Sequence, residues 1–142
     1  MTLEIRNLSR AAFAPYGDLI APDPAEGAFQ VVIREPDELG WRIAVSQLTR
    51  RPVDCLGAHA NSRESFEPLS GICVILVAQY ETPERMEAFL LDAPVCLHRN
   101  TWHSVIALSE RAVVKITEND RMESETFPLP ALLDIGMFQK PA

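Results

Sequence analysis

The sequence predicts an all-β domain, because strand-like segments follow one another between turns along most of its 142 residues. Eleven prolines and six glycines are spread through the chain, so long helical windows are scarce. The segment 71–78 is one continuous apolar run, which is typical of a strand buried on both faces. The strands are not separated by the regular helices of a doubly wound sheet, so the pattern favours an antiparallel barrel or sandwich.

The N-terminal part predicts a single helical turn followed by a strand. Ser9 is a suitable N-cap for this turn, and Pro15 and Gly17 end it. The segment 19–21 is expected to begin a strand, and 22–28 is a turn-rich loop.

The middle of the chain alternates in the way expected of half-buried strands. In Trp41–Leu48 this alternation places Trp41, Ile43 and Val45 on one face. Further strands are expected at 29–33, 53–56, 95–97, 104–108 and 112–116.

One longer helix is expected at Thr82–Leu90. Thr82 can cap it, Pro83 fits its first position, and Met86, Phe89 and Leu90 fall on one side. The segment 128–142 has apolar residues without a clear period, and predicts a short helix or a tail packed on the body or on a second subunit.

Composition limits the classes of function. The length suits one domain over residues 1–142. A net charge of −7 argues against nucleic acid and anionic membranes as partners, since both require a basic face. No signal peptide is visible, and three cysteines at irregular spacing predict reduced thiols rather than disulfides. These features predict a cytoplasmic protein.

The three histidines carry the strongest functional signal. Four residues separate His59 from Glu64, and His98 and His103 bracket a short turn-like stretch. Neighbouring side chains of a strand point to opposite faces, so a shared site must collect its groups from different strands. His59, Glu64 and His103 form the smallest set of two imidazoles and one carboxylate that holds a divalent metal ion or a small anionic substrate. His98 is a fourth candidate.

The same residues resemble metal-binding motifs of the cupin superfamily. His59, Glu64 and Gly71 match the second half of the first motif, in which Gly57 replaces the earlier histidine. His103 matches the final histidine of the second motif. The resemblance implies an antiparallel jelly-roll barrel, the cupin-like double-stranded β-helix, with one or two short helices.

A closer resemblance, to the ureidoglycolate lyase family, covers about residues 13–108. It is carried by the segments 13–20, 59–71, 86–89 and, most specifically, His98-Arg-Asn-Thr-Trp-His103. The family is commonly dimeric and releases urea from ureidoglycolate to give glyoxylate in purine and allantoin breakdown. The resemblance implies a homodimer that acts on a small anionic substrate, with His59, Glu64, His98 and His103 as catalytic candidates.

The chain departs from the family near the key histidine. It has Gly57-Ala-His-Ala60 where the family has Glu-Arg-His-Pro, and it lacks the family's Asp-Arg-Gly-Gly after the last core strand. Arg63, Arg99 and Lys115 are candidate replacements that would bind the substrate carboxylate, and Trp102 is a candidate pocket wall. The acidic residues from 118 to 125 are expected to be solvated surface.

Chemical roles follow from the type of reaction. His103 or His59 is the expected base and Glu64 the expected acid or ligand, and a bound divalent metal ion would have His59, Glu64 and His103 as its ligands. Two alternatives remain open: a different metal-dependent cupin enzyme, such as a small isomerase or dioxygenase, and a non-catalytic cupin that binds or senses a small molecule.

Overall fold

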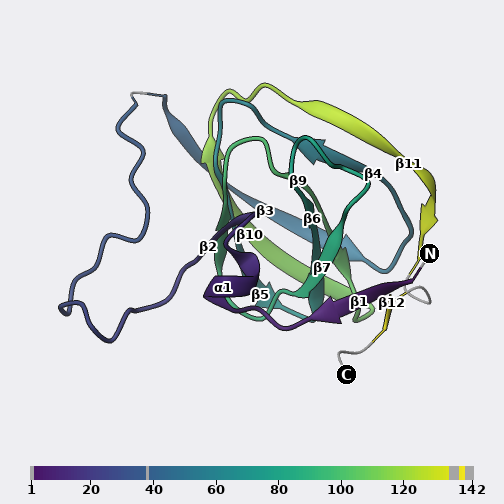
Figure 1. Ribbon diagram of the computed structural model, residues 1–142, viewed down its shortest axis with the longest axis horizontal. Coiled ribbons are helices and arrows are strands. Elements are labelled where there is room, and N and C mark those ends of the chain that lie inside the picture. The colour runs from purple at the N-terminus through teal and green to yellow at the C-terminus, as the bar shows by residue number, and fades with distance from the viewer. Residues whose placement is uncertain (1, 38, 135–137, 140–142) are drawn as a thin grey trace.

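Two β-sheets and one short helix form the structure, a computed structural model that describes residues 2–37, 39–134 and 138–139 (Figure 1). The elements in chain order are β1 (Leu3–Arg6), α1 (Arg10–Phe13), β2 (Gly17–Leu19), β3 (Trp41–Thr49), β4 (Val53–Ala58), β5 (Glu64–Ser70), β6 (Cys73–Ala78), β7 (Glu87–Leu90), β8 (Val95–Leu97), β9 (Trp102–Ala107), β10 (Arg111–Asn119), β11 (Glu125–Leu133) and β12 (Phe138–Gln139). Among the described residues, no helix is long and apolar enough to cross a membrane.

The strands are arranged in a seven-stranded and a five-stranded sheet. The first has the order β11-β4-β9-β6-β7-β1-β12, and the second has the order β2-β8-β5-β10-β3. Most neighbouring pairs are antiparallel, and β1 pairs in parallel with β7 and β12. The predicted all-β jelly-roll class is confirmed.

The core has two parts, which meet at β6. Cys73, Ile75 and Val77 pack between the two sheets, together with Phe66 and Phe89. The alternate side chains of the same strand pack on its other side, against residues of β4, β9 and β11. Of these strands, β11 forms the outer arc of the molecule in Figure 1. This arrangement explains the continuous apolar run in the sequence, because every residue of β6 is buried.

The N-terminal helical turn is confirmed. Ser9 has extended backbone angles and its Oγ accepts a hydrogen bond of 3.1 Å from the amide of Ala12. Phe13, at the end of α1, is fully buried and packs edge-on against Phe89 of β7, so this single turn is stabilised by its contact with the core.

The predicted helix at Thr82–Leu90 is wrong. Tight turns occupy its first half, with amide-to-carbonyl hydrogen bonds from Thr82 to Gln79 and from Arg85 to Thr82. Its second half is β7, which pairs with β6 on one side and with β1 on the other. Pairing between two sheet strands supplies more backbone hydrogen bonds and burial than a short isolated helix, and therefore overrides the local helical pattern.

Two other predicted segments differ from the structure. Residues 29–33 form no strand and extend from the body within the long connection between β2 and β3 (Figure 1). In the predicted segment 128–142, the residues up to Leu133 form no helix. They belong to β11, which pairs with β4, so this part packs on the body as the second alternative had it, but as a strand. Residues 135–137 and 140–142 of the predicted C-terminal segment lie outside the described residues.

Candidate active site

Three strands bring the predicted histidines and the carboxylate together. His59 directly follows β4, Glu64 is the first residue of β5, and His103 is the second residue of β9. Gly57 pairs with His103 across the β4–β9 ladder, which places the end of β4 beside the histidine of β9. His59 and Glu64 therefore lie at the facing ends of two consecutive strands, and the loop of residues 60–63 joins them.

The loop between β4 and β5 is held by hydrogen bonds to the end of β10. The Oγ of Ser62 accepts from the amide of Asn119 at 3.0 Å, and the Nδ2 of Asn119 donates to the carbonyl of Asn61 at 2.7 Å. Ser62 is itself buried. These contacts fix the positions from which His59 and Glu64 project.

The side chains converge on one carboxylate oxygen. The Oε2 of Glu64 lies 2.7 Å from the Nε2 of His103 and 3.3 Å from the Nε2 of His59. The centroids of the two imidazole rings are 5.3 Å apart. One ligand atom from each residue lies within 4.8 Å of the others, so His59, Glu64 and His103 can hold a metal ion.

Hydrogen bonds on the outer side of each ring set its tautomer. The Nδ1 of His103 lies 2.9 Å from the carbonyl of Thr101, and the Nδ1 of His59 lies 3.0 Å from the Oγ of Ser124 and 3.3 Å from the carbonyl of Glu123. A carbonyl only accepts, so Nδ1 carries the hydrogen in both rings. The Nε2 of each neutral ring therefore presents a lone pair to the shared centre, as metal-ligating histidines do.

Electrostatics keep the carboxylate ionised. Burial by itself raises the pKa of Glu64, but the close approach of His103 and His59, and the positive charge of these rings when they are protonated, outweigh it and lower the pKa to about 2. The close approach of Glu64 raises the pKa of His59, against the opposing effect of burial. The centre thus combines a stable negative charge with an imidazole that readily accepts a proton.

The donor set fits a divalent metal ion. The Oε2 of Glu64 is buried and accepts no hydrogen bond of normal geometry, although both Nε2 atoms lie close to it. Two imidazole nitrogens and a carboxylate oxygen around one point are typical ligands of iron, manganese or zinc. An ion at this point would satisfy the orphaned oxygen.

A small cavity between the sheets gives access to this centre. It has a volume of about 160 Å³ and contains the side chains of Glu64 and His103; we call it the inner cavity. Its remaining wall is mostly apolar and consists of Ser46, Leu48, Phe66, Val105, Val114 and Ile116. A space below the usual size of drug-binding pockets suits a ligand of few atoms.

His98 lies beside the three converging side chains but does not join them. It borders the same narrow space as His59, Glu64 and His103. Its Nε2 is 3.0 Å from the carbonyl of Ala14, so this nitrogen donates its hydrogen to the N-terminal segment. The described side-chain hydrogen bond of His98 therefore connects this part of the site to Ala14, the residue that follows α1.

Trp102 is not a wall of the inner cavity. It points to the opposite face of β9 from His103 and belongs to the core beneath β4 and β11. Its ring stacks on Tyr80 with centroids 5.5 Å apart, and its Nε1–H donates to the Tyr80 carbonyl at 2.9 Å. The alternation of side chains along a strand explains why the neighbours Trp102 and His103 serve different parts of the molecule.

The three predicted carboxylate-binding cations do not line the inner cavity either. Arg63 pairs with Glu35 at 2.7 Å and with Asp18 at 3.2 Å, and Arg99 pairs with the same Glu35 at 2.6 Å. Both arginines therefore fasten the connection between β2 and β3 to the body. Lys115 pairs with Glu67 at 3.4 Å, and its neighbours Val114 and Ile116 are the residues of β10 that face inward.

Sequence reasoning missed a second acid near the site. Glu118 was predicted to be solvated surface, but it is only 7% exposed and pairs in register with Glu64. Burial, followed by the negative charge of Glu64, raises the pKa of Glu118, and the guanidinium of Arg42 lies 3.6 Å from its carboxylate. Glu118 falls two residues after the inward-facing Ile116, so strand alternation carried a signal for its burial.

Known proteins resemble this chain in sequence and in fold. It is 30% identical over 140 positions to the ureidoglycolate lyase of Rhizobium leguminosarum bv. trifolii, an alignment that covers 83% of this chain and 84% of the relative. It is 32% identical over 122 positions to the ureidoglycolate lyase of Agrobacterium fabrum, with 71% and 74% covered. No protein-family model matches the chain.

Among solved structures, a dTDP sugar isomerase from Desulfovibrio desulfuricans superposes with a TM-score of 0.55 at 18% identity, covering 82% of this chain and 84% of that one. This likeness concerns the fold alone and agrees with the cupin-like jelly roll. The sequence relatives are similar along most of their own length, at up to 32% identity. The chain therefore belongs to the ureidoglycolate lyase family.

Proposed function

We propose that the protein releases urea from ureidoglycolate and leaves glyoxylate, with His103, Glu64 and His59 at the reacting centre. The observation that carries this proposal is that Glu64 and His103 belong both to the three-residue centre and to the wall of the inner cavity. A small substrate in that cavity would meet a carboxylate and an imidazole 2.7 Å apart. Membership of the ureidoglycolate lyase family supports the choice of substrate.

The reaction requires two proton transfers and the loss of one bond. The hydroxyl of ureidoglycolate loses its proton, the electron pair of its O–H bond forms the carbonyl of glyoxylate, and the carbon–nitrogen bond breaks. The departing nitrogen takes up a proton and leaves as urea. One base and one acid on the enzyme are therefore sufficient, and a single group can serve as both in turn.

The chain supplies a proton acceptor at a defined atom. The carbonyl of Thr101 accepts the Nδ1–H of His103, so the Nε2 of the neutral ring holds its lone pair beside Glu64. After this nitrogen accepts the hydroxyl proton, its N–H can donate to the Oε2 of Glu64, 2.7 Å away, until the proton passes to the departing nitrogen. A divalent ion held by His59, Glu64 and His103 would instead supply Lewis-acid activation of the hydroxyl.

Turnover of ureidoglycolate by single variants tests this proposal. His103→Ala and His59→Ala are each expected to lower kcat at least about 100-fold, because each removes an imidazole from the centre. Urea and glyoxylate are measured in parallel, with Lys115→Gln as a control on the outward face of β10.

Unchanged turnover in both histidine variants would rule the assignment out. Oxygen-dependent turnover with a tightly held iron or manganese would favour a different cupin enzyme. A protein that ureidoglycolate stabilises against heat without being consumed would favour a binding or sensing role.

We also propose that two copies of the chain associate through β3. Within the described residues this strand pairs only with β10 and forms one edge of the five-stranded sheet. Trp41, Ile43 and Val45 on its outer face are 71%, 53% and 59% exposed. A second copy fits this surface, because a two-fold axis packs the outer face of β3 against the same face of its partner and covers both apolar stripes at once.

Light scattering after size-exclusion chromatography tests the association. The wild type is expected at twice the chain mass of 15.8 kDa, and Ile43→Glu is expected at the mass of one chain, since the variant buries an unpaired charge in the interface. Ile72→Glu is a matched control, because Ile72 is 54% exposed in the turn between β5 and β6. A wild-type monomer, or a dimer that survives Ile43→Glu, contradicts the proposed interface.

A further inference from the structure

A larger cavity adjoins the inner one. It has a volume of about 550 Å³ and lies between the end of β3, the start of β4 and strand β9; we call it the outer cavity. Leu48 and Val105 line both cavities, so the two spaces meet at these side chains. The outer cavity is therefore the space next to the one that contains Glu64 and His103.

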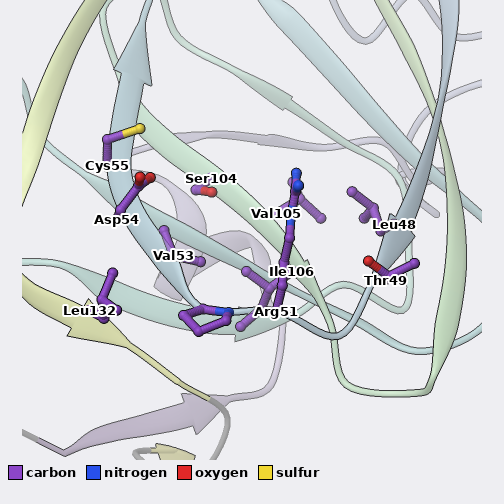
Figure 2. A pocket seen from close by; sticks show the side chains of 11 residues that line it. Leu48, Thr49, Arg51, Val53, Asp54, Cys55, Ser104, Val105, Ile106 and Leu132 are labelled. Atoms are coloured by element: carbon purple, nitrogen blue, oxygen red, sulfur yellow. The ribbon is translucent and has the colours of Figure 1, made fainter.

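Arg51 is the cation of the outer cavity. Figure 2 shows its side chain extending beside Val105 and Ile106. Arg51 is exposed, and no acidic or carbonyl partner contacts its guanidinium within the described part of the chain. Arg63 and Arg99, by contrast, form ion pairs with Glu35, which compensates their charges. The planar guanidinium is therefore available to bind a carboxylate through two parallel hydrogen bonds.

Polar side chains line the β4 side of the same cavity. Among them, the Asp54 carboxylate is a hydrogen-bond acceptor, in contrast to the Arg51 guanidinium, which is a donor. Asp54 and Cys55 of β4 and Ser104 of β9 face this space in Figure 2. Asp54 forms no ion pair with Arg51. Its carboxylate lies within hydrogen-bonding reach of the Cys55 thiol and has further lone pairs that can accept from a ligand. A molecule that carries a carboxylate at one end and N–H groups at the other matches both sides, whereas a simple anion matches only Arg51.

We propose that the outer cavity is a binding subsite for small carboxylates that also carry amide or ureido N–H groups. Arg51 binds the carboxylate, and Asp54 accepts hydrogen bonds from the N–H groups. The subsite deepens the proposed function and rests on it for the link to turnover: ureidoglycolate has both kinds of group, and it would bind here before it moves to Glu64 and His103 in the adjoining inner cavity. It also replaces Arg63, Arg99 and Lys115 as the source of the carboxylate-binding charge.

Cys55 provides a reporter inside this subsite. Of the three cysteines, all within the described residues, Cys73 and Cys96 are buried, while Cys55 is partly exposed and lines the outer cavity. Burial raises the pKa of all three thiols, that of Cys96 to about 11, and the Asp54 carboxylate raises the pKa of Cys55 further, so access to the reagent is what distinguishes Cys55 from the other two. Alkylation of the folded protein is therefore expected at Cys55, and a ligand in the outer cavity should slow it.

The test measures the rate of Cys55 alkylation by a maleimide, followed by mass spectrometry, with oxamate as the probe. Oxamate carries a carboxylate and an amide N–H group, and it is expected to protect the wild type, whereas the neutral oxamide is not. In Arg51→Gln the oxamate concentration for half-protection should rise about tenfold, the range expected for the loss of a charge-assisted pair. Arg50→Gln is the matched control, because the guanidinium of Arg50 donates to the carbonyl of Leu108 instead.

A second comparison tests the role of Asp54. Acetate has the carboxylate without the N–H group, so it should protect Cys55 less well than oxamate in the wild type. Asp54→Ala should remove the difference between the two probes.

Equal protection by oxamate in Arg51→Gln and the wild type, or no protection of the wild type, overturns the subsite. The assay needs no turnover, which separates it from the proposed function. If oxamate protects through Arg51 while ureidoglycolate is not consumed, the proposed function fails and the subsite stands. If ureidoglycolate is consumed equally well by Arg51→Gln and Cys55 is not protected, the subsite fails alone.

Discussion

Glu64→Gln is expected to lower kcat/KM for ureidoglycolate at least about 100-fold and to weaken binding of a divalent ion at least about tenfold. The amide has nearly the shape of the carboxylate but no negative charge. The Oε2 of Glu64 is the atom nearest to both imidazoles, at 2.7 Å from His103 and 3.3 Å from His59. Glu64 needs that charge both to stabilise an imidazolium and to coordinate an ion. The substitution is therefore expected to impair whichever of these two roles Glu64 has.

Two measurements check this result: steady-state kinetics, and calorimetric titration of chelator-treated protein with Zn²⁺ or Mn²⁺. Glu67→Gln is the matched control, since Glu67 lies on the same strand but points outward and pairs with Lys115. It should retain both properties of the wild type. Ion affinity and turnover that survive Glu64→Gln would show that the centre lies elsewhere.

Gly71→Ala is expected to lower the free energy of unfolding by at least about 3 kcal/mol and the melting temperature by about 10 °C. Gly71 forms the turn between β5 and β6 with a φ of 74°, a left-handed conformation that costs a non-glycine residue about 1 kcal/mol. An added Cβ would also lie 2.8 Å from the Cα of Ala112 and closer still to the carbonyl oxygen of Arg111. Both contacts are with backbone, which cannot move aside without disturbing β10.

Gly27→Ala is the control for this substitution. Gly27 has no atom within 4 Å of an added Cβ, so its variant should stay within about 0.5 kcal/mol of the wild type. Thermal and urea unfolding of the two variants give the comparison directly. A Gly71→Ala protein as stable as Gly27→Ala would contradict the geometry of this turn.

The strands that alternate or run continuously apolar were predictable, because their periodicity follows from local geometry. Trp41–Leu48 falls within β3, and the run ending at Ala78 is β6. The helical interpretation of Thr82–Leu90 failed because the same residues satisfy their backbone groups better between β6 and β1. A pattern of four or five apolar residues does not distinguish these outcomes, since the deciding partners are distant in sequence.

The candidate site also has one part that could be predicted from the sequence and one part that could not. His59, Glu64 and His103 were predictable as a set, because their residue types and spacing match a ligand motif that requires separate strands. The choice of cation was not predictable, because Arg63 and Arg99 look as suitable as Arg51 in the sequence. Their pairing with Glu35, which lies far away along the chain, removes them from consideration.

The sequence by itself determined an all-β chain, a strand buried on both faces, and the two imidazoles and one carboxylate at the centre. Each of these depends on side-chain type and on spacings that act within a strand or a loop. Only the tertiary structure decided that Glu118 is buried beside Glu64, that Trp102 faces away from His103, and that Arg63 and Arg99 are paired with acids while Arg51 has none among the described residues. The environment of a charge is set by the strands and ion pairs packed around it, and these come from the whole chain.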